Sequence, residues 1–112
     1  MATKTATQTF DGEAATVSWA AMGNADDGTP VPGVGLLGSV QFAGTFGSAT
    51  VVLEGSNDGG TTYATIKDAT GTAVSTGTAA IFSLNANVKL VRPRTSGGTG
   101  TSLNVTLFAR YV

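Results

Sequence analysis

The chain has 112 residues, a net charge of -1 from six basic and seven acidic side chains, and neither cysteine nor histidine. A single domain of this length can bury a core without disulfides or a structural metal. The missing residue types exclude thiol nucleophiles, thiolate zinc sites and histidine-dependent triads, and the lack of a basic patch argues against a nucleic-acid partner.

The N-terminal segment, residues 1–13, is rich in threonine and shows no apolar periodicity beyond Phe10. Because it cannot form a core of its own, we predict an extended N-terminal arm, followed by a β-sandwich domain at residues 14–112. The segment also lacks the apolar stretch of a signal peptide, and no run in the chain approaches the ~20 apolar residues of a membrane helix. We therefore expect synthesis in the cytoplasm and no membrane partner.

The remaining chain reads as a series of short strands. Apolar Ala15, Val17 and Trp19 alternate with polar residues and predict the first one. Residues 23–35 concentrate glycine, proline, asparagine and aspartate, which predicts a long surface loop without regular structure. Further strand-like runs lie at residues 36–43, 49–54, 63–67, 79–84, 88–94 and 102–111. With no helical stripe, this pattern predicts an all-β fold of a single domain, either a sandwich or a barrel.

Several residues in the later strands suggest sheet edges or contacts with a partner protein. The apolar side chains of residues 102–111 fall on one face, so Phe108 points the other way, toward a partner or beneath a loop. Pro93 cannot donate a ladder hydrogen bond, which predicts that its strand is at an edge or ends there. Arg92 and Arg94 share a face and either clamp a partner carboxylate or lie on a solvated edge.

Several motifs resemble ligand sites without having the required context. GVGLLG, residues 33–38, matches a dinucleotide-binding pattern, but Pro30 and Pro32 precede it and a strand follows it. Asp26 and Asp27 lack the further carboxylates of a calcium site, so we interpret them as a solvated turn. We predict no enzyme, with no catalytic, cofactor-binding or metal-ligating residue.

The stretch EGSNDGGTTYATI, residues 54–66, lies between two strand-like runs. Its Asn-Asp-Gly-Gly core holds the residues that tolerate positive φ, so a β-hairpin accounts for all of them. The calcium-loop pattern is not matched. We therefore interpret this stretch as a turn rather than a ligand loop.

The order of these segments resembles small capsid decoration, or cement, proteins of tailed bacteriophages. The resemblance covers residues 16–110 and rests on TVSW, GTPV, GTFGSATVVLEGSNDGGTTYAT and VRPRTSGGTGTSLNVTLFAR. It implies an antiparallel, jelly-roll-like β-sandwich that binds the outer face of a phage head in the virion and stabilises contacts between major capsid subunits. It also implies a homo-oligomer, dimer or trimer, on the capsid.

On this interpretation the arm, the long loop and the exposed strands supply the partner contacts. The candidate contact residues are Thr5, Thr7, Phe10, Pro30, Pro32, Arg92, Arg94 and Phe108. The alternative is a carbohydrate-binding or adhesin-like β-sandwich, such as a head fibre or tail component that recognises a host surface glycan, because GSNDG also resembles the hairpin of discoidin-type domains. A sugar site would need exposed Trp or Tyr platforms, whereas core burial explains Trp19 and the two tyrosines more simply.

Overall fold

The protein is all-β, as predicted. The computed structural model describes residues 3–11 and 14–111, and no helix occurs in these ranges. Ten strands are present in them: β1 (Thr3–Lys4), β2 (Thr7–Asp11), β3 (Ala14–Met22), β4 (Asp27–Gly28), β5 (Val31–Thr45), β6 (Thr50–Ser56), β7 (Ala64–Thr65), β8 (Ser75–Thr76), β9 (Ala80–Ser96) and β10 (Ser102–Tyr111).

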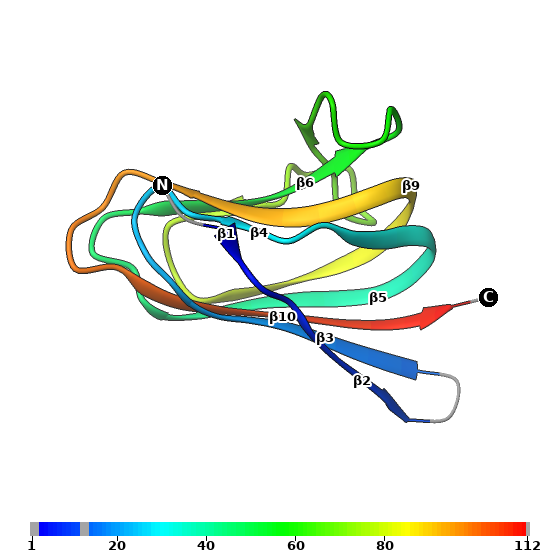
Figure 1. Cartoon of the computed structure of the whole chain (residues 1–112), viewed down its shortest axis with the longest axis horizontal. Coiled ribbons are helices and arrows are strands. Elements are labelled where there is room, and N and C mark those ends of the chain that lie inside the picture. The colour runs from blue at the N-terminus through cyan, green and yellow to red at the C-terminus, as the bar shows by residue number, and fades with distance from the viewer. Residues whose placement is uncertain (1–2, 12–13, 112) are drawn as a thin grey trace.

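The strands form two packed layers, which is the architecture of a β-sandwich (Figure 1). The main strand order is β1-β4-β9-β5-β10-β3-β2, and β6 joins β9 and carries β7 and β8. Most neighbours are antiparallel, whereas β1 and β4 are parallel. The first part of β9, from Ala80, pairs with β5, and its last part, up to Ser96, pairs with β6. The long strand β9 therefore passes from one layer to the other. Jelly-roll connectivity remains a prediction.

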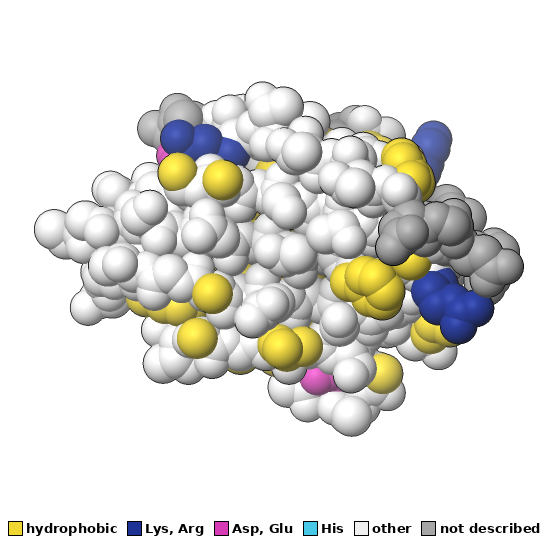
Figure 2. Space-filling model, turned by 90° about the horizontal axis from the view of Figure 1, so that it is seen from below, with side chains coloured by type: hydrophobic (Ala, Val, Ile, Leu, Met, Phe, Trp, Pro, Cys, Tyr) yellow, Lys and Arg dark blue, Asp and Glu magenta, His cyan; other side chains and the backbone are white. Residues whose placement is uncertain are grey.

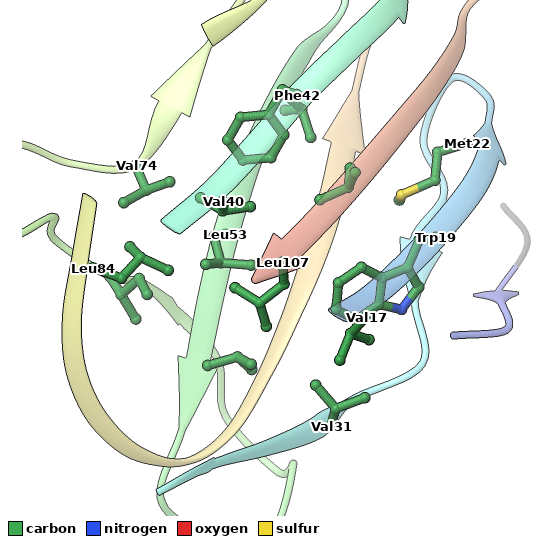
Figure 3. Close-up of a cluster of buried hydrophobic side chains, with 14 of the residues drawn as sticks. Val17, Trp19, Met22, Val31, Val40, Phe42, Leu53, Val74, Leu84 and Leu107 are labelled. Carbon is green, nitrogen blue, oxygen red and sulfur yellow. The ribbon is translucent and has the colours of Figure 1, made fainter. Parts of the chain in front are cut away.

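The core lies between the layers and is built by alternating side chains, as Figure 3 shows. In β10 the residues predicted to face inward, Leu103, Val105 and Leu107, are fully buried. Phe108 is 48 % exposed, so it faces solvent and the alternative that a loop covers it is wrong. Apolar burial of this kind is the main stabilising contribution in a fold without disulfides.

Trp19 is the largest core side chain and is fully buried, as its strand pattern predicted. Its indole N–H donates to the carbonyl of Thr29 over 3.0 Å, which satisfies the one polar group of the ring. Gly28 packs directly on the indole, since a Cβ there would lie 2.6 Å from Trp19 Cδ1 and 2.7 Å from Pro93 Cδ. The glycine of the GTPV segment is therefore required by packing.

The prediction of a long irregular loop at residues 23–35 is wrong. β4 lies within it, and β5 begins at Val31. The proline and glycine residues mark a bend in β5 instead: Pro32 lies opposite Leu90, Gly33 lies opposite Val88, and the register shifts between the two pairs. A Cβ on Gly33 would come within 2.9 Å of the Val88 carbonyl oxygen, so only glycine allows this close approach.

The prediction that Pro93 marks an edge or a strand end is also wrong. β9 continues to Ser96 and has β6 on one side and β4 on the other. The carbonyl of Leu53, opposite Pro93 in β6, accepts the N–H of Ile66 over 3.0 Å and so needs no donor from β9. The proline ring fills the space beside Gly28, where a donor would otherwise point.

The described part of the predicted arm runs along the chain's own sheet. β1 pairs with β4, and β2 pairs with β3 over five residues, from Thr7 opposite Ser18 to Asp11 opposite Ala14. The N–H of Thr29 also donates to the carbonyl of Lys4 over 2.8 Å. Residues 1, 2, 12 and 13 of the predicted arm lie outside the described part.

Candidate functional site

The two arginines that the sequence singled out bind one carboxylate of their own chain. In β9, Val91 and Pro93 face the core, which directs Arg92 and Arg94 to the opposite face. β6 places Glu54 directly opposite Arg92. The Nε atoms of Arg92 and Arg94 lie 3.2 Å from Glu54 Oε1 and 3.0 Å from Oε2, respectively. Charge-assisted pairs of this kind are among the stronger hydrogen bonds in proteins.

Two further residues complete this group, which we call the arginine cluster: Arg92, Arg94, Glu54, Asp27 and Tyr63. The Nη1 atom of Arg92 lies 3.1 Å from Asp27 Oδ2, and its Cζ lies 3.7 Å from the centre of the Tyr63 ring. Ion pairing on one side and a cation–π contact on the other hold this guanidinium in place. The Glu54 side chain is only 6 % exposed, so the cluster joins β4, β6 and β9 through a largely buried carboxylate.

The carboxylate that these arginines hold belongs to the chain itself, whereas the sequence predicted a partner carboxylate or a solvated edge. Both oxygens of Glu54 accept a guanidinium N–H, which gives this carboxylate a structural role. The Arg94 side chain is 42 % exposed and the Arg92 side chain 21 %, so Arg94 presents more surface to a partner.

The GSNDGG stretch forms a turn that Asp58 organises. Its Oδ1 accepts the Thr62 N–H over 2.9 Å and the Ser56 hydroxyl over 2.7 Å, and these bonds lower the pKa of Asp58 to about 2. Gly59 and Gly60 have φ angles of 77° and 94°, the region that glycine tolerates. The strands on either side, β6 and β7, pair antiparallel. The hairpin prediction is confirmed.

A second aspartate turn was not predicted. Asp68 Oδ1 accepts the hydroxyl and N–H of Thr70 and the N–H of Thr72, and these bonds lower the pKa of Asp68. The signal was present in the sequence DATGT, because aspartate followed by glycine at this spacing is typical of such turns.

The interpretation of Asp26 and Asp27 as a solvated turn is wrong. Asp26 is 6 % exposed, and its Oδ2 accepts the N–H of Gly23 over 2.7 Å. Its carbonyl accepts the N–H of Thr95 in β9. Asp27 belongs to the arginine cluster. Both carboxylates are therefore structural.

The outward side of β2, β3, β10, β5 and residues 80–86 of β9 forms a broad surface, which we call the outer face (Figure 2). One row across these strands contains Thr9, Thr16, Phe108, Ser39 and Ser83. The adjacent row contains Thr7, Ser18, Thr106, Gln41 and Ile81. Neither row has a charged side chain, and hydroxyl groups predominate.

Two apolar residues of the outer face were not singled out from the sequence. Ile81 is 64 % exposed and Leu37 is 46 % exposed. Phe108 of β10 lies opposite Ser39 of β5, and Leu37 is two residues before Ser39. The side chains of Phe108 and Leu37 are therefore diagonal neighbours. Ile81 could not be assigned to a face from its sequence, because either Ile81 or its neighbour Phe82 could face the core. Phe82 packs edge-on against Phe42 at 5.9 Å, which leaves Ile81 outside.

The other predicted contact residues lie apart from this surface or at its margin. Thr5, Thr7 and Phe10 are exposed, and Phe10 is 69 % exposed. Pro30 is half-buried and Pro32 is exposed, where β5 begins. The structure therefore brings Arg92 and Arg94 together but does not gather the predicted contacts into one patch.

A small-molecule site is not evident in the described part of the chain. Residues 3–11 and 14–111 enclose no detected pocket and contain no group of three metal-ligating acidic side chains. In the same ranges, no helix is long and apolar enough to span a membrane. Small-molecule sites are usually concave, whereas the outer face is a broad strand surface, which suits contact with a macromolecule better than enclosure of a ligand. No protein-family model, curated protein or solved structure matches this chain.

Proposed function

We propose that the protein is a capsid decoration protein, a virion component that binds the outer surface of a phage head and stabilises contacts between major capsid subunits. The sequence resemblance supplies the biological setting. The observation that carries the proposal structurally is the outer face, which is broad, rich in hydroxyl groups and nearly free of charge. Short hydroxyl side chains lose little conformational entropy when another protein covers them.

The apolar residues of the outer face provide anchors for such a contact. Phe108, Leu37 and Ile81 are exposed among polar neighbours. A few residues contribute most of the binding energy of a protein interface, and burial of exposed apolar side chains in a partner pocket is favourable. Arg110 in the same sheet adds a charge at the margin, and a charge there favours specificity more than affinity.

The outer face is about as large as one standard protein interface. Five strands about 4.8 Å apart, with seven residues at about 3.3 Å each, cover a plane of roughly 550 Å², and the accessible surface of the side chains on that plane is larger. A standard specific interface buries about 800 Å² of accessible surface per partner. Many copies on one particle would add further to the retention of each.

The Trp and Tyr side chains that the structure describes do not provide the platform that the carbohydrate-binding alternative needs. Trp19 is fully buried, and the Tyr63 ring is occupied by the guanidinium of Arg92. A sugar platform requires an aromatic face that is open to solvent beside polar groups.

The proposal is tested by sedimentation of the purified protein with undecorated heads of the phage that encodes it. We expect saturable binding, and we expect Phe108→Asp to weaken it by at least tenfold, because the charge would be buried in the contact. Thr99→Asp, an added charge in the exposed β9–β10 loop outside the outer face, is the matched control and should bind normally. Absence of binding by the unmodified protein would refute the proposal, and equal binding by the two variants would refute the role of the outer face.

A further inference from the structure

Among the described residues β2 pairs only with β3, so it forms a sheet edge without the protection that edges usually have. The other end of the main strand order, β1, is two residues long and carries Lys4. The side of β6 that faces away from β9 is covered by β7 and β8. β2 has five residues in unbroken register with β3, and Thr7 to Phe10 are all exposed and uncharged. Proteins usually block such an edge with lysine, proline, a bulge or a very short strand, because it can pair with another chain.

The side chain of Phe10 makes this edge more distinctive. Phe10 lies opposite Ala15 of β3, and Ala15 lies opposite Ala109 of β10; both alanines are buried. Phe10 therefore projects from the core side of the sheet, beyond the part that the second layer covers, and is 69 % exposed. Figure 1 shows β2 at the margin of its layer. The row of Ala109, Ala15 and Phe10 on the core side of the sheet therefore ends at an exposed aromatic residue in the edge strand β2.

We propose that β2 pairs antiparallel with β2 of a second copy of this chain, around a two-fold axis at Thr9. This register places Thr9 opposite the partner's Thr9, and Phe10 opposite the partner's Gln8. The two Phe10 rings become diagonal neighbours on the same face, within reach of each other. Asp11, the one charged residue of β2, lies opposite the partner's Thr7, so no like charges meet.

A second copy fits this edge because the strand is complementary to itself. A two-fold contact uses the same patch twice and closes, so one sequence satisfies both sides. Each β2 supplies the outward-pointing N–H and C=O groups that the other lacks. The pairing covers few residues, so we expect a weak dimer that forms at high protein concentration. The inference goes beyond the proposed function and does not depend on it.

The test is sedimentation equilibrium of the whole purified chain from about 10 μM to 1 mM, with two charge variants at the axis. Thr9→Lys and Thr9→Glu each place like charges opposite each other in the dimer. Each variant should weaken dimerisation by up to about fivefold, which is the upper end of the effect of a like-charged cross-strand pair. An equimolar mixture should recover a dimer, and native mass spectrometry should show that the mixed species predominates.

Matched controls separate this effect from a general effect of charge. Thr99→Lys and Thr99→Glu place the same charges at an exposed position of the β9–β10 loop and should dimerise like the unmodified chain. Equal thermal stability of all four variants shows that the sheet itself is intact. The inference is overturned if the unmodified chain remains a monomer at 1 mM or forms a trimer. It is also overturned if Thr9→Lys dimerises normally or the mixture shows no recovery.

Discussion

Replacement of Glu54 by glutamine should destabilise the protein more than any other single change in the arginine cluster. Glutamine has nearly the same shape but cannot balance the charges of Arg92 and Arg94, and its amide would place a donor beside a guanidinium. Removal of one partner from a fully buried ion pair costs about 3–5 kcal/mol. Glu54 is 6 % exposed, but its partners are 21 % and 42 % exposed, so water compensates part of this loss. We expect a loss of about 2–3 kcal/mol.

Urea unfolding followed by fluorescence measures this loss directly. Trp19 is the one tryptophan of the chain and is fully buried, so its emission reports unfolding of the core. We expect a lower midpoint with an unchanged slope, and a melting temperature lower by about 8–12 °C at roughly 4 °C per kcal/mol. Arg94→Gln is the comparison, because the more exposed partner should cost about 1 kcal/mol or less. A loss below 1 kcal/mol for Glu54→Gln, or a larger loss for Arg94→Gln, would show that the cluster does not stabilise the fold as described.

Four further substitutions test the turn, the indole packing and the difference between the two faces. The pKa of Asp58 lies near 2, below its ordinary value of 3.8, so the stability that it contributes is present above pH 3.8 and is lost as the pH falls toward 2. Carboxyl titration by NMR gives this value directly, and Asp58→Asn should remove that part of the acid dependence; a normal pKa would contradict the turn geometry. Gly28→Ala should cost about 1–3 kcal/mol in urea unfolding, because its Cβ would overlap the indole; a neutral result would contradict the contact. Leu107→Ala should cost about 2–5 kcal/mol, whereas Leu37→Ala on the outer face should stay within about 0.5 kcal/mol; similar losses would contradict the assignment of faces.

Local patterns were sufficient to predict much of the fold. The period-two alternation around Trp19 and along β10 predicted two core strands, because one buried face determines which residues must be apolar. The Asn-Asp-Gly-Gly segment predicted its hairpin, since positive φ limits the choice of residues. These features depend on residues that are close in the sequence.

Features that depend on distant residues could not be predicted in this way. Pro32 and Gly33 are typical loop residues, but in the structure they lie at the register shift where the long strand β5 bends. Arg92 and Arg94 were correctly placed on one face, whereas their acceptor, Glu54, lies 38 residues away from Arg92 and is reached only through strand pairing. Exposure of Leu37 and Ile81 likewise depends on which side the second layer covers.

The most direct test of the proposed function is cryo-electron microscopy of the phage particle that carries this gene product. We predict density for this β-sandwich on the outside of the head, with the outer face that contains Phe108 turned toward the major capsid protein. Density with the outer face turned to solvent would contradict the proposed contact. A location in the tail or baseplate, or absence from the virion, would contradict the function itself.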